Sequence, residues 1–161
     1  MSMSVQADNG IGTAGDVLCF ALPAAVAGLT IGHKDNKGML QFGESMALSL
    51  STAYGLKYAI DEKRPDGKSY SFPSVHASVS FTSAEFLRKR YGWEYGIPAY
   101  AVATFVAYSR VETRQHYVHD VIAGAVIGIG SSYLFSRPYK GWYVQPVVDT
   151  KFYGVNLSCS W

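Results

Sequence analysis

This chain has few cysteines, a small net charge and no long apolar run. Each of these features argues against a class of protein. Its 161 residues contain two cysteines, Cys19 and Cys159, which have no zinc-ligand spacing. The formal net charge is only +2, and the basic residues are dispersed apart from those at 88–90, so we expect no nucleic-acid partner. A Cys19–Cys159 disulfide in an oxidising compartment stays open, because sequence spacing alone does not show proximity.

The short apolar runs also bear on where the protein resides. The longest charge-free stretches, 17–32 and 121–136, have sixteen residues each, whereas a spanning helix needs about twenty. A soluble or peripheral protein that contacts a membrane at its surface is therefore favoured over the alternative, an integral inner-membrane protein. Val5-Gln6-Ala7 before Asp8 is typical of a signal-peptidase site, which predicts export to the periplasm or cell envelope with the signal peptide removed. No pattern indicates an oligomeric state.

Helical patterns fill most of the chain and predict an all-α fold, a compact bundle of about five helices followed by a short C-terminal β-hairpin. Pro23 is expected to kink the first helix, Ser74 to cap the third, and Pro98 to lie in the first turn of the fourth. The expected helices cover residues 13–31, 41–60, 74–90, 97–110 and 117–136.

The residue pattern changes after Pro138. Apolar and polar residues alternate from Val155 to Trp161, which is strand periodicity, and residues 142–148 supply a partner strand across a turn at 149–150. The chain is therefore divided into a flexible lead-in (1–12), a helical domain (13–137) and a hairpin tail (138–161). The glycine pattern that begins in the lead-in, at 10–15, matches a dinucleotide-binding motif, but no strand precedes it.

Three short segments carry nearly all the chemistry that the sequence suggests. Their cations, Lys57, Arg64 and Arg110, suit a phosphoryl group, because Arg forks match phosphate geometry and Lys supplies a point charge. In order, the segments read Lys57-x6-Arg64-Pro65, Pro73-Ser74-Val75-His76 and Ser109-Arg110-x5-His116-x3-Asp120.

Two histidines and a carboxylate complete this set. His116 and Asp120 are four residues apart at the expected start of a helix, so the carboxylate can hold one imidazole nitrogen and leave the other nucleophilic. His76 supplies a second imidazole, which is suited to protonating a leaving oxygen. Ser74 lies at a predicted helix N-terminus, where free N–H groups favour an anion. Taken alone, a plain helix cap is the simpler interpretation of Ser74.

A metal site is the alternative use of the same region. His116, His119 and Asp120 would share one helical face. Arg110 and Arg114 lie close to them in the sequence and would repel a divalent cation. We therefore expect no metal.

The three segments resemble the signature of the type 2 phosphatidic acid phosphatase superfamily, which includes lipid phosphate phosphatases, bacterial acid phosphatases and vanadium haloperoxidases. The match runs in order from Lys57 to Asp120, and only Val75 departs, where the family has glycine. The resemblance implies that residues 13–137 form a helical phosphatase domain, with a site at the helix ends that needs no metal or other cofactor.

The resemblance also implies a role for each residue. His116 attacks phosphorus to give a phosphohistidine, and Asp120 orients it. His76 protonates the leaving alcohol and then activates the water that hydrolyses the intermediate. The implied phosphate ligands are Lys57, Arg64, Ser74, the backbone N–H of Val75, and Arg110.

The expected function is a metal-independent phosphatase that hydrolyses phosphomonoesters, with lipid phosphates such as phosphatidic acid as substrates. Val75 keeps an alternative open, because glycine allows close approach of an anion and valine at positive φ would be strained. We expect weaker phosphate binding or slower turnover than in Val75→Gly. The alternative is a module that binds phosphate or a phospholipid headgroup with impaired catalysis; a structural envelope protein, suggested only by the tail, is the third.

The choice between a lipid and a small soluble phosphate is left open by the sequence. Aromatic residues in and around the first two helices could line a groove for an acyl chain or could be ordinary core. These residues are Phe20, Phe42, Tyr54, Tyr58, Tyr70 and Phe72.

Overall fold

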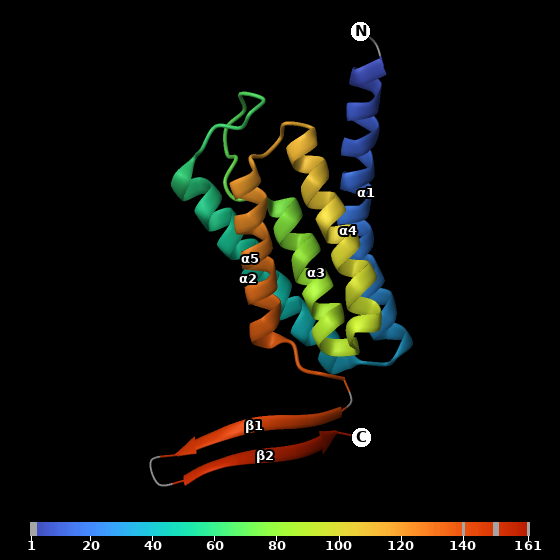
Figure 1. Cartoon of the computed structure of the whole chain (residues 1–161), viewed down its shortest axis with the longest axis vertical. Coiled ribbons are helices and arrows are strands. Elements are labelled where there is room, and N and C mark those ends of the chain that lie inside the picture. The colour runs from blue at the N-terminus through green and yellow to red at the C-terminus, as the bar shows by residue number, and fades with distance from the viewer. Residues whose placement is uncertain (1–2, 140, 150–151, 161) are drawn as a thin grey trace.

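Five helices pack side by side, and the N-terminal helix extends beyond the others at one end of the bundle (Figure 1). This computed structural model describes the backbone of residues 3–139, 141–149 and 152–160 and the side chains of residues 10–139. The helices are α1 (Met3–Gly32), α2 (Asn36–Ile60), α3 (Val75–Tyr91), α4 (Trp93–Glu112) and α5 (Val118–Phe135). The predicted helical bundle is confirmed.

The helix boundaries follow residues that the sequence marks. Ser74 is the N-cap of α3, where its Oγ accepts a hydrogen bond from the N–H three residues on, at 3.4 Å. Gly92, at φ 99°, separates α3 from α4 with a backbone conformation that favours glycine. α1 is longer than predicted, since it begins at Met3. The placement of Pro98 was wrong, because α4 already begins at Trp93 and Pro98 lies inside it.

α3 lies at the centre of the bundle and contacts each of the other four helices. Small side chains permit this arrangement. A Cβ at Gly124 of α5 would collide with the backbone oxygen of Ser74. Toward α2, the hydroxyl of Thr82 donates to that of Ser49 at 2.9 Å. Much of the interior around α3 is therefore built from small and hydroxyl-bearing residues.

A separate apolar core joins α1 to α3 and α4. It fixes the position of α1 against α4, which matters below because α1 contributes to the candidate site. Its buried members are Leu22, Val26, Ala84, Phe86, Leu87, Ala99 and Ala103.

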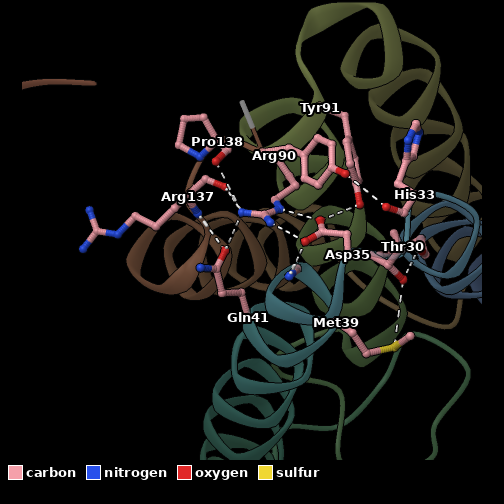
Figure 2. Close-up of polar contacts among 12 residues, drawn as sticks. Thr30, His33, Asp35, Met39, Gln41, Arg90, Tyr91, Arg137 and Pro138 are labelled. Atoms are coloured by element: carbon pink, nitrogen blue, oxygen red, sulfur yellow. Dashed lines mark hydrogen bonds and ion pairs between the residues drawn. The ribbon is translucent and has the colours of Figure 1, made fainter. Parts of the chain in front are cut away.

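A buried ion pair closes the end of the bundle where α1 turns into α2 (Figure 2). Arg90, near the end of α3, donates to both carboxylate oxygens of Asp35 in that turn. The hydroxyl of Tyr91 donates to the same carboxylate at 2.9 Å, and Arg90 also donates to the backbone oxygens of Arg137 and Pro138. Burial alone would raise the pKa of Asp35, but the bonds from Arg90, a backbone N–H and Tyr91 hold it below its usual range.

Two helices in the described part of the chain are long and apolar enough to cross a membrane, at Gly10–Gly32 of α1 and Val118–Phe135 of α5. Their large apolar side chains lie largely on the outside of the bundle. Phe20 is 75% exposed, Val126 is 65% exposed and Leu134 is 64% exposed. The counts of charge-free residues understated the first of these helices, because Asp16 interrupts its apolar run.

Beyond α5 the backbone forms two strands, β1 (Gly141–Asp149) and β2 (Phe152–Ser160). They pair antiparallel, with Gly141 opposite Ser160, and lie beyond the end of the helical bundle in Figure 1. The side chain of Cys159 lies outside the described residues, so the question of a Cys19–Cys159 disulfide stays open. Cys19 itself is buried.

Candidate active site

The three sequence segments meet at the end of the bundle opposite the ion pair. Lys57 lies in the last turn of α2, Arg64 in the loop between α2 and α3, and Ser74 at the start of α3. Arg110 lies in the last turn of α4, and His116 in the short connection to α5. Figure 1 shows both connections at the same end of the bundle. The fold therefore gathers residues that are widely separated in sequence.

His116 and Asp120 form the central pair. Asp120 is fully buried, and His116 is only 3% exposed. Nδ1 of His116 lies 3.3 Å from Oδ2 of Asp120. The same carboxylate oxygen accepts hydrogen bonds from the hydroxyl of Ser71 and from the backbone N–H of Tyr117, the latter at 2.9 Å. These bonds hold the carboxylate in place, and its contact with Nδ1 leaves Nε2 as the nitrogen of His116 that can react.

Burial and neighbouring cations set the charge of this pair. Burial, followed by the positive charges of Arg64 and Lys57, lowers the pKa of His116, while Asp120 acts in the opposite direction. His116 is therefore neutral near pH 7, which is the form in which imidazole is a nucleophile. Burial, with a smaller effect of Arg64, also lowers the pKa of Lys57 to about 8.

The two cations are held differently. Lys57 is 8% exposed, and its Nζ donates to the backbone oxygens of Tyr70 and Ser71 at 2.7 and 3.4 Å. Nε of Arg64 is buried and has no hydrogen-bond partner among the described residues. An unsatisfied buried donor is costly, and a phosphate oxygen is an acceptor that matches guanidinium geometry.

The first turn of α3 supplies backbone donors. The N–H of Ser74 donates to the backbone oxygen of Asp120 at 3.0 Å, and its hydroxyl caps the helix, as the simpler interpretation of Ser74 predicts. The N–H groups of Val75 and His76 begin the helix and have no acceptor within it, so they can bind an anion. Val75 is not among the residues at positive φ. The backbone strain considered for valine at this position does not arise.

Arg110 is fully buried and directed toward α1. Its guanidinium donates to the backbone oxygen of Gly12 at 2.6 Å and to the carboxylate of Asp16 at 2.7 Å. The same carboxylate oxygen lies 3.3 Å from Nε2 of His76. Burial, followed by Arg110, lowers the pKa of His76, and Asp16 opposes that effect.

Sequence reasoning missed two of these contributors, Ser71 and Asp16. Ser71 belongs to no motif, and Asp16 lies on a helix far from the three segments in the sequence. The glycines at 10–15 were one indication in the sequence that α1 approaches the site closely. A Cβ at Gly15 would collide with the side chain of Arg110. This glycine pattern therefore permits close helix approach and is not a nucleotide-binding loop.

The metal site considered from the sequence would use His116, His119 and Asp120. The structure brings a different set of carboxylates and histidines together. Nε2 of His119 lies 3.1 Å from Glu62 and 3.2 Å from Oδ1 of Asp120. Within the described residues these three side chains, without His116, are the group whose ligand atoms could share an ion. The Glu62–His119 contact ties the loop after α2 to the start of α5.

An apolar cavity of about 390 Å³ opens beside His76, between α1, α2 and α3. Val75 and His76 form part of its wall. Three of the six aromatic residues considered for an acyl-chain groove, Phe20, Phe42 and Tyr54, also line it. Of the others, Tyr58 and Tyr70 pack edge to face against each other, and Phe72 stacks on His119.

Fold and site together define a class, the helical-bundle phosphatases. The profile of the PAP2 superfamily matches residues 38–142. The chain belongs to this superfamily. The match includes nearly all of α2 and the whole of α3, α4 and α5, whereas α1 lies outside it.

Two relatives with assigned activities are lipid A phosphatases. The chain is 32% identical over 166 residues to the lipid A 4'-phosphatase of Helicobacter pylori, and the alignment covers 91% of this chain and 83% of that protein. It is 36% identical over 89 residues to the lipid A 1-phosphatase of Porphyromonas gingivalis, which covers 52% of this chain and 20% of that protein.

Two crystal structures share the fold. Aquifex aeolicus LpxE superposes with a TM-score of 0.71 at 20% identity, covering 80% of this chain and 84% of that one. The transmembrane PAP2-type phosphatidylglycerolphosphate phosphatase from Bacillus subtilis superposes with a TM-score of 0.63 at 24% identity, covering 84% of this chain and 76% of that one.

Proposed function

We propose that this protein is a metal-independent phosphatase of phosphorylated lipids that acts through a phosphohistidine at His116. The observation that carries the proposal is the buried His116–Asp120 pair, in which Nδ1 is held at 3.3 Å and neutral Nε2 is left to react. Lys57 and Arg64 lie close enough to lower the pKa of His116. Cations at that range would also stabilise an anion in front of Nε2.

The first half of the reaction transfers the phosphoryl group to the protein. Lys57, Arg64 and Arg110, with Ser74 and the N–H groups of Val75 and His76, bind the phosphate oxygens. Nε2 of His116 forms a bond to phosphorus as the bond from phosphorus to the ester oxygen breaks. His76, which the negative charge of the bound phosphate keeps protonated despite its burial, gives its proton to that oxygen, so the product leaves as a neutral alcohol. Asp120 stabilises the positive charge that develops on the His116 ring.

The second half returns the protein to its starting state. His76, now neutral, takes a proton from water, and the hydroxide oxygen bonds to phosphorus as the bond from phosphorus to Nε2 breaks. The products are inorganic phosphate and neutral His116, with His76 protonated again. All protons in this cycle are carried by His76 and water, so the scheme requires no metal.

We propose a lipid A-type phosphate as the preferred substrate class, ahead of phosphatidic acid. The relatives from Helicobacter pylori and Porphyromonas gingivalis are lipid A phosphatases, and the alignment with the first covers 83% of that protein. The apolar cavity beside His76 supports a lipid substrate, since His76 would protonate the oxygen that joins phosphate to the lipid. An acyl chain in that cavity would contact Phe20, Phe42 and Tyr54.

We also propose that the bundle is integral to the inner membrane, which the sequence treated as the alternative location. The helical stretches Gly10–Gly32 and Val118–Phe135 are long enough to cross it. Their exposed apolar side chains, Phe20 and Val126 among them, form outward surfaces that suit lipid contact better than water.

The test is phosphate release by purified protein in detergent micelles containing EDTA. Substrates are lipid A, phosphatidic acid and p-nitrophenyl phosphate, and the variants are His116→Ala and His33→Ala. His33 is a matched control, because it lies at the opposite end of the bundle. We expect release that survives EDTA and His33→Ala, is lost in His116→Ala, and is fastest from lipid A. Release that requires a divalent cation, or that persists in His116→Ala, would exclude the proposal.

The phosphate-binding module with impaired catalysis stays the second candidate, because valine still replaces glycine at position 75. It predicts phosphate binding without release from any of the three substrates. Restoration of turnover by Val75→Gly would then identify the side chain as the cause.

A further inference from the structure

Asp16 lies among the candidate catalytic residues although no part of the family signature includes it. Its carboxylate oxygen is 2.7 Å from Nη1 of Arg110 and 3.3 Å from Nε2 of His76. It comes from α1, which lies outside the region that the PAP2 profile matches. One negatively charged oxygen thus joins the cation expected to bind phosphate to the histidine expected to protonate the leaving group.

The contact between Asp16 and Arg110 uses guanidinium N–H groups that a bound phosphate would also need. Among the residues whose side chains are described, Arg110 makes four hydrogen bonds, to the backbone oxygen of Gly12 and to the side chains of Asp16, Ser109 and Gln115. A guanidinium has five N–H groups. For Arg110 to hold a phosphate by two parallel bonds, at least one of these acceptors must give way, and the side chain of Asp16 is 51% exposed and can rotate toward solvent.

The packing of α1 holds Asp16 beside Arg110. Gly15, its neighbour in sequence, lies so close that a Cβ there would collide with the side chains of Ser109 and Arg110. Further along α1, Leu22 and Val26 are buried in the apolar core with α3 and α4. The backbone of α1 is therefore fixed, and movement at this point is confined to the Asp16 side chain.

We infer that Asp16 is a further residue of this active site and sets its affinity for phosphate, because its carboxylate occupies the anion position beside Arg110 and His76 until a phosphate group displaces it. This inference rests on the proposed function, which assigns phosphate binding to Arg110. A carboxylate that stays near the bound anion repels it. Wild-type protein therefore binds inorganic phosphate, the product, more weakly than its cations alone would allow.

The experiment is isothermal titration of inorganic phosphate into purified protein at pH 7.5. The variants are Asp16→Asn, which removes the charge at constant size; Asp16→Ser, a smaller neutral residue in case Asn impairs folding; and Asp16→Glu, which retains the charge. Glu112→Gln is the matched control: Glu112 and Asp16 line the same polar cavity, but the described hydrogen bonds of Arg110 do not include Glu112. Circular dichroism verifies the fold of each variant.

We expect the dissociation constant for phosphate to fall by about tenfold or more in Asp16→Asn and Asp16→Ser, as removal of a like charge within a few ångströms allows. Asp16→Glu and Glu112→Gln should stay within about threefold of wild type. Unchanged or weaker binding in both neutral variants would overturn the inference. If wild type still hydrolyses lipid phosphate in that case, the proposed function survives; absence of both phosphate binding and hydrolysis in every protein would overturn the two together.

Discussion

Replacement of Asp120 by asparagine removes the charge behind His116 while retaining the size of the side chain. Oδ2 of Asp120 accepts hydrogen bonds from Ser71 and from the backbone N–H of Tyr117, and it contacts Nδ1 of His116. The amide oxygen of Asn can take the same position and keep all three contacts. The fold should therefore survive, and the change isolates the effect of one negative charge.

The expected effect follows from where positive charge appears. Burial lowers the pKa of His116 and Asp120 opposes that effect, so loss of the Asp120 charge does not remove the neutral, nucleophilic form of the imidazole. As Nε2 bonds to phosphorus, the ring becomes positive, and a buried carboxylate at Nδ1 stabilises it through a charge-assisted bond. We expect kcat to fall about 10²–10³-fold, equivalent to about 3–4 kcal/mol. KM should change by less than about threefold, because Asp120 does not touch the substrate in this scheme.

The assay is steady-state hydrolysis of p-nitrophenyl phosphate and of lipid A in EDTA, with Glu62→Gln as the control. Glu62 faces His119 and not His116, so its loss should leave kcat within about threefold of wild type. The reasoning would be refuted if Asp120→Asn kept more than about a third of wild-type kcat. Equal losses in the two variants would also contradict it, since the effect would then not depend on contact with His116.

Three further predictions concern substrate, pH and packing. Because Val75 is not strained, we no longer expect Val75→Gly to improve phosphate binding or turnover, as the sequence suggested. Val75 lines the apolar cavity, so Val75→Gly should raise KM for lipid A at least about threefold and leave that for p-nitrophenyl phosphate unchanged. Faster turnover of both substrates would contradict this. Inhibition by phosphate should weaken above about pH 8 in wild type as Lys57 loses its proton, and Lys57→Arg should abolish this dependence in pH-stepped inhibition assays. Gly124→Ala should lower the free energy of unfolding by about 1–3 kcal/mol, because its Cβ would meet the backbone of α3. Gly130→Ala on the same helix, where a Cβ meets open space, is the thermal-denaturation control, and equal effects of the two would refute the packing argument.

The parts of the fold that the sequence predicts are those with local causes. Ser74 caps α3 and Gly92 ends it, and both were read from residue type alone. The start of α4 was misplaced because proline is favoured in a first helical turn, yet Pro98 is accommodated inside this helix. Packing between helices overrides such a local preference, and this packing cannot be predicted from the spacing of residues in the sequence.

The candidate site divides in the same way. The contact of His116 with Asp120 was expected from their spacing of four residues at the start of a helix, and it forms although His116 itself lies in the connection before α5. The positions of Ser71 and Asp16 depend on how the α2–α3 loop and α1 pack against the other helices, which no local pattern encodes. The exposure of Phe20 and Val126 is likewise a property of the assembled bundle. Because these apolar side chains lie on the outside of the bundle, an integral membrane protein is favoured. The length of the charge-free stretches had favoured a soluble or peripheral protein of the cell envelope.

The most direct test of the central claim is to trap the covalent intermediate. Protein turning over a phosphorylated lipid in EDTA is quenched with alkali, which preserves phosphohistidine, and digested for mass spectrometry. The account predicts phosphate on the peptide that contains His116, at Nε2, and none in His116→Ala protein treated in the same way. Phosphate on another residue, or no phosphorylated peptide from protein that is demonstrably releasing phosphate, would contradict it.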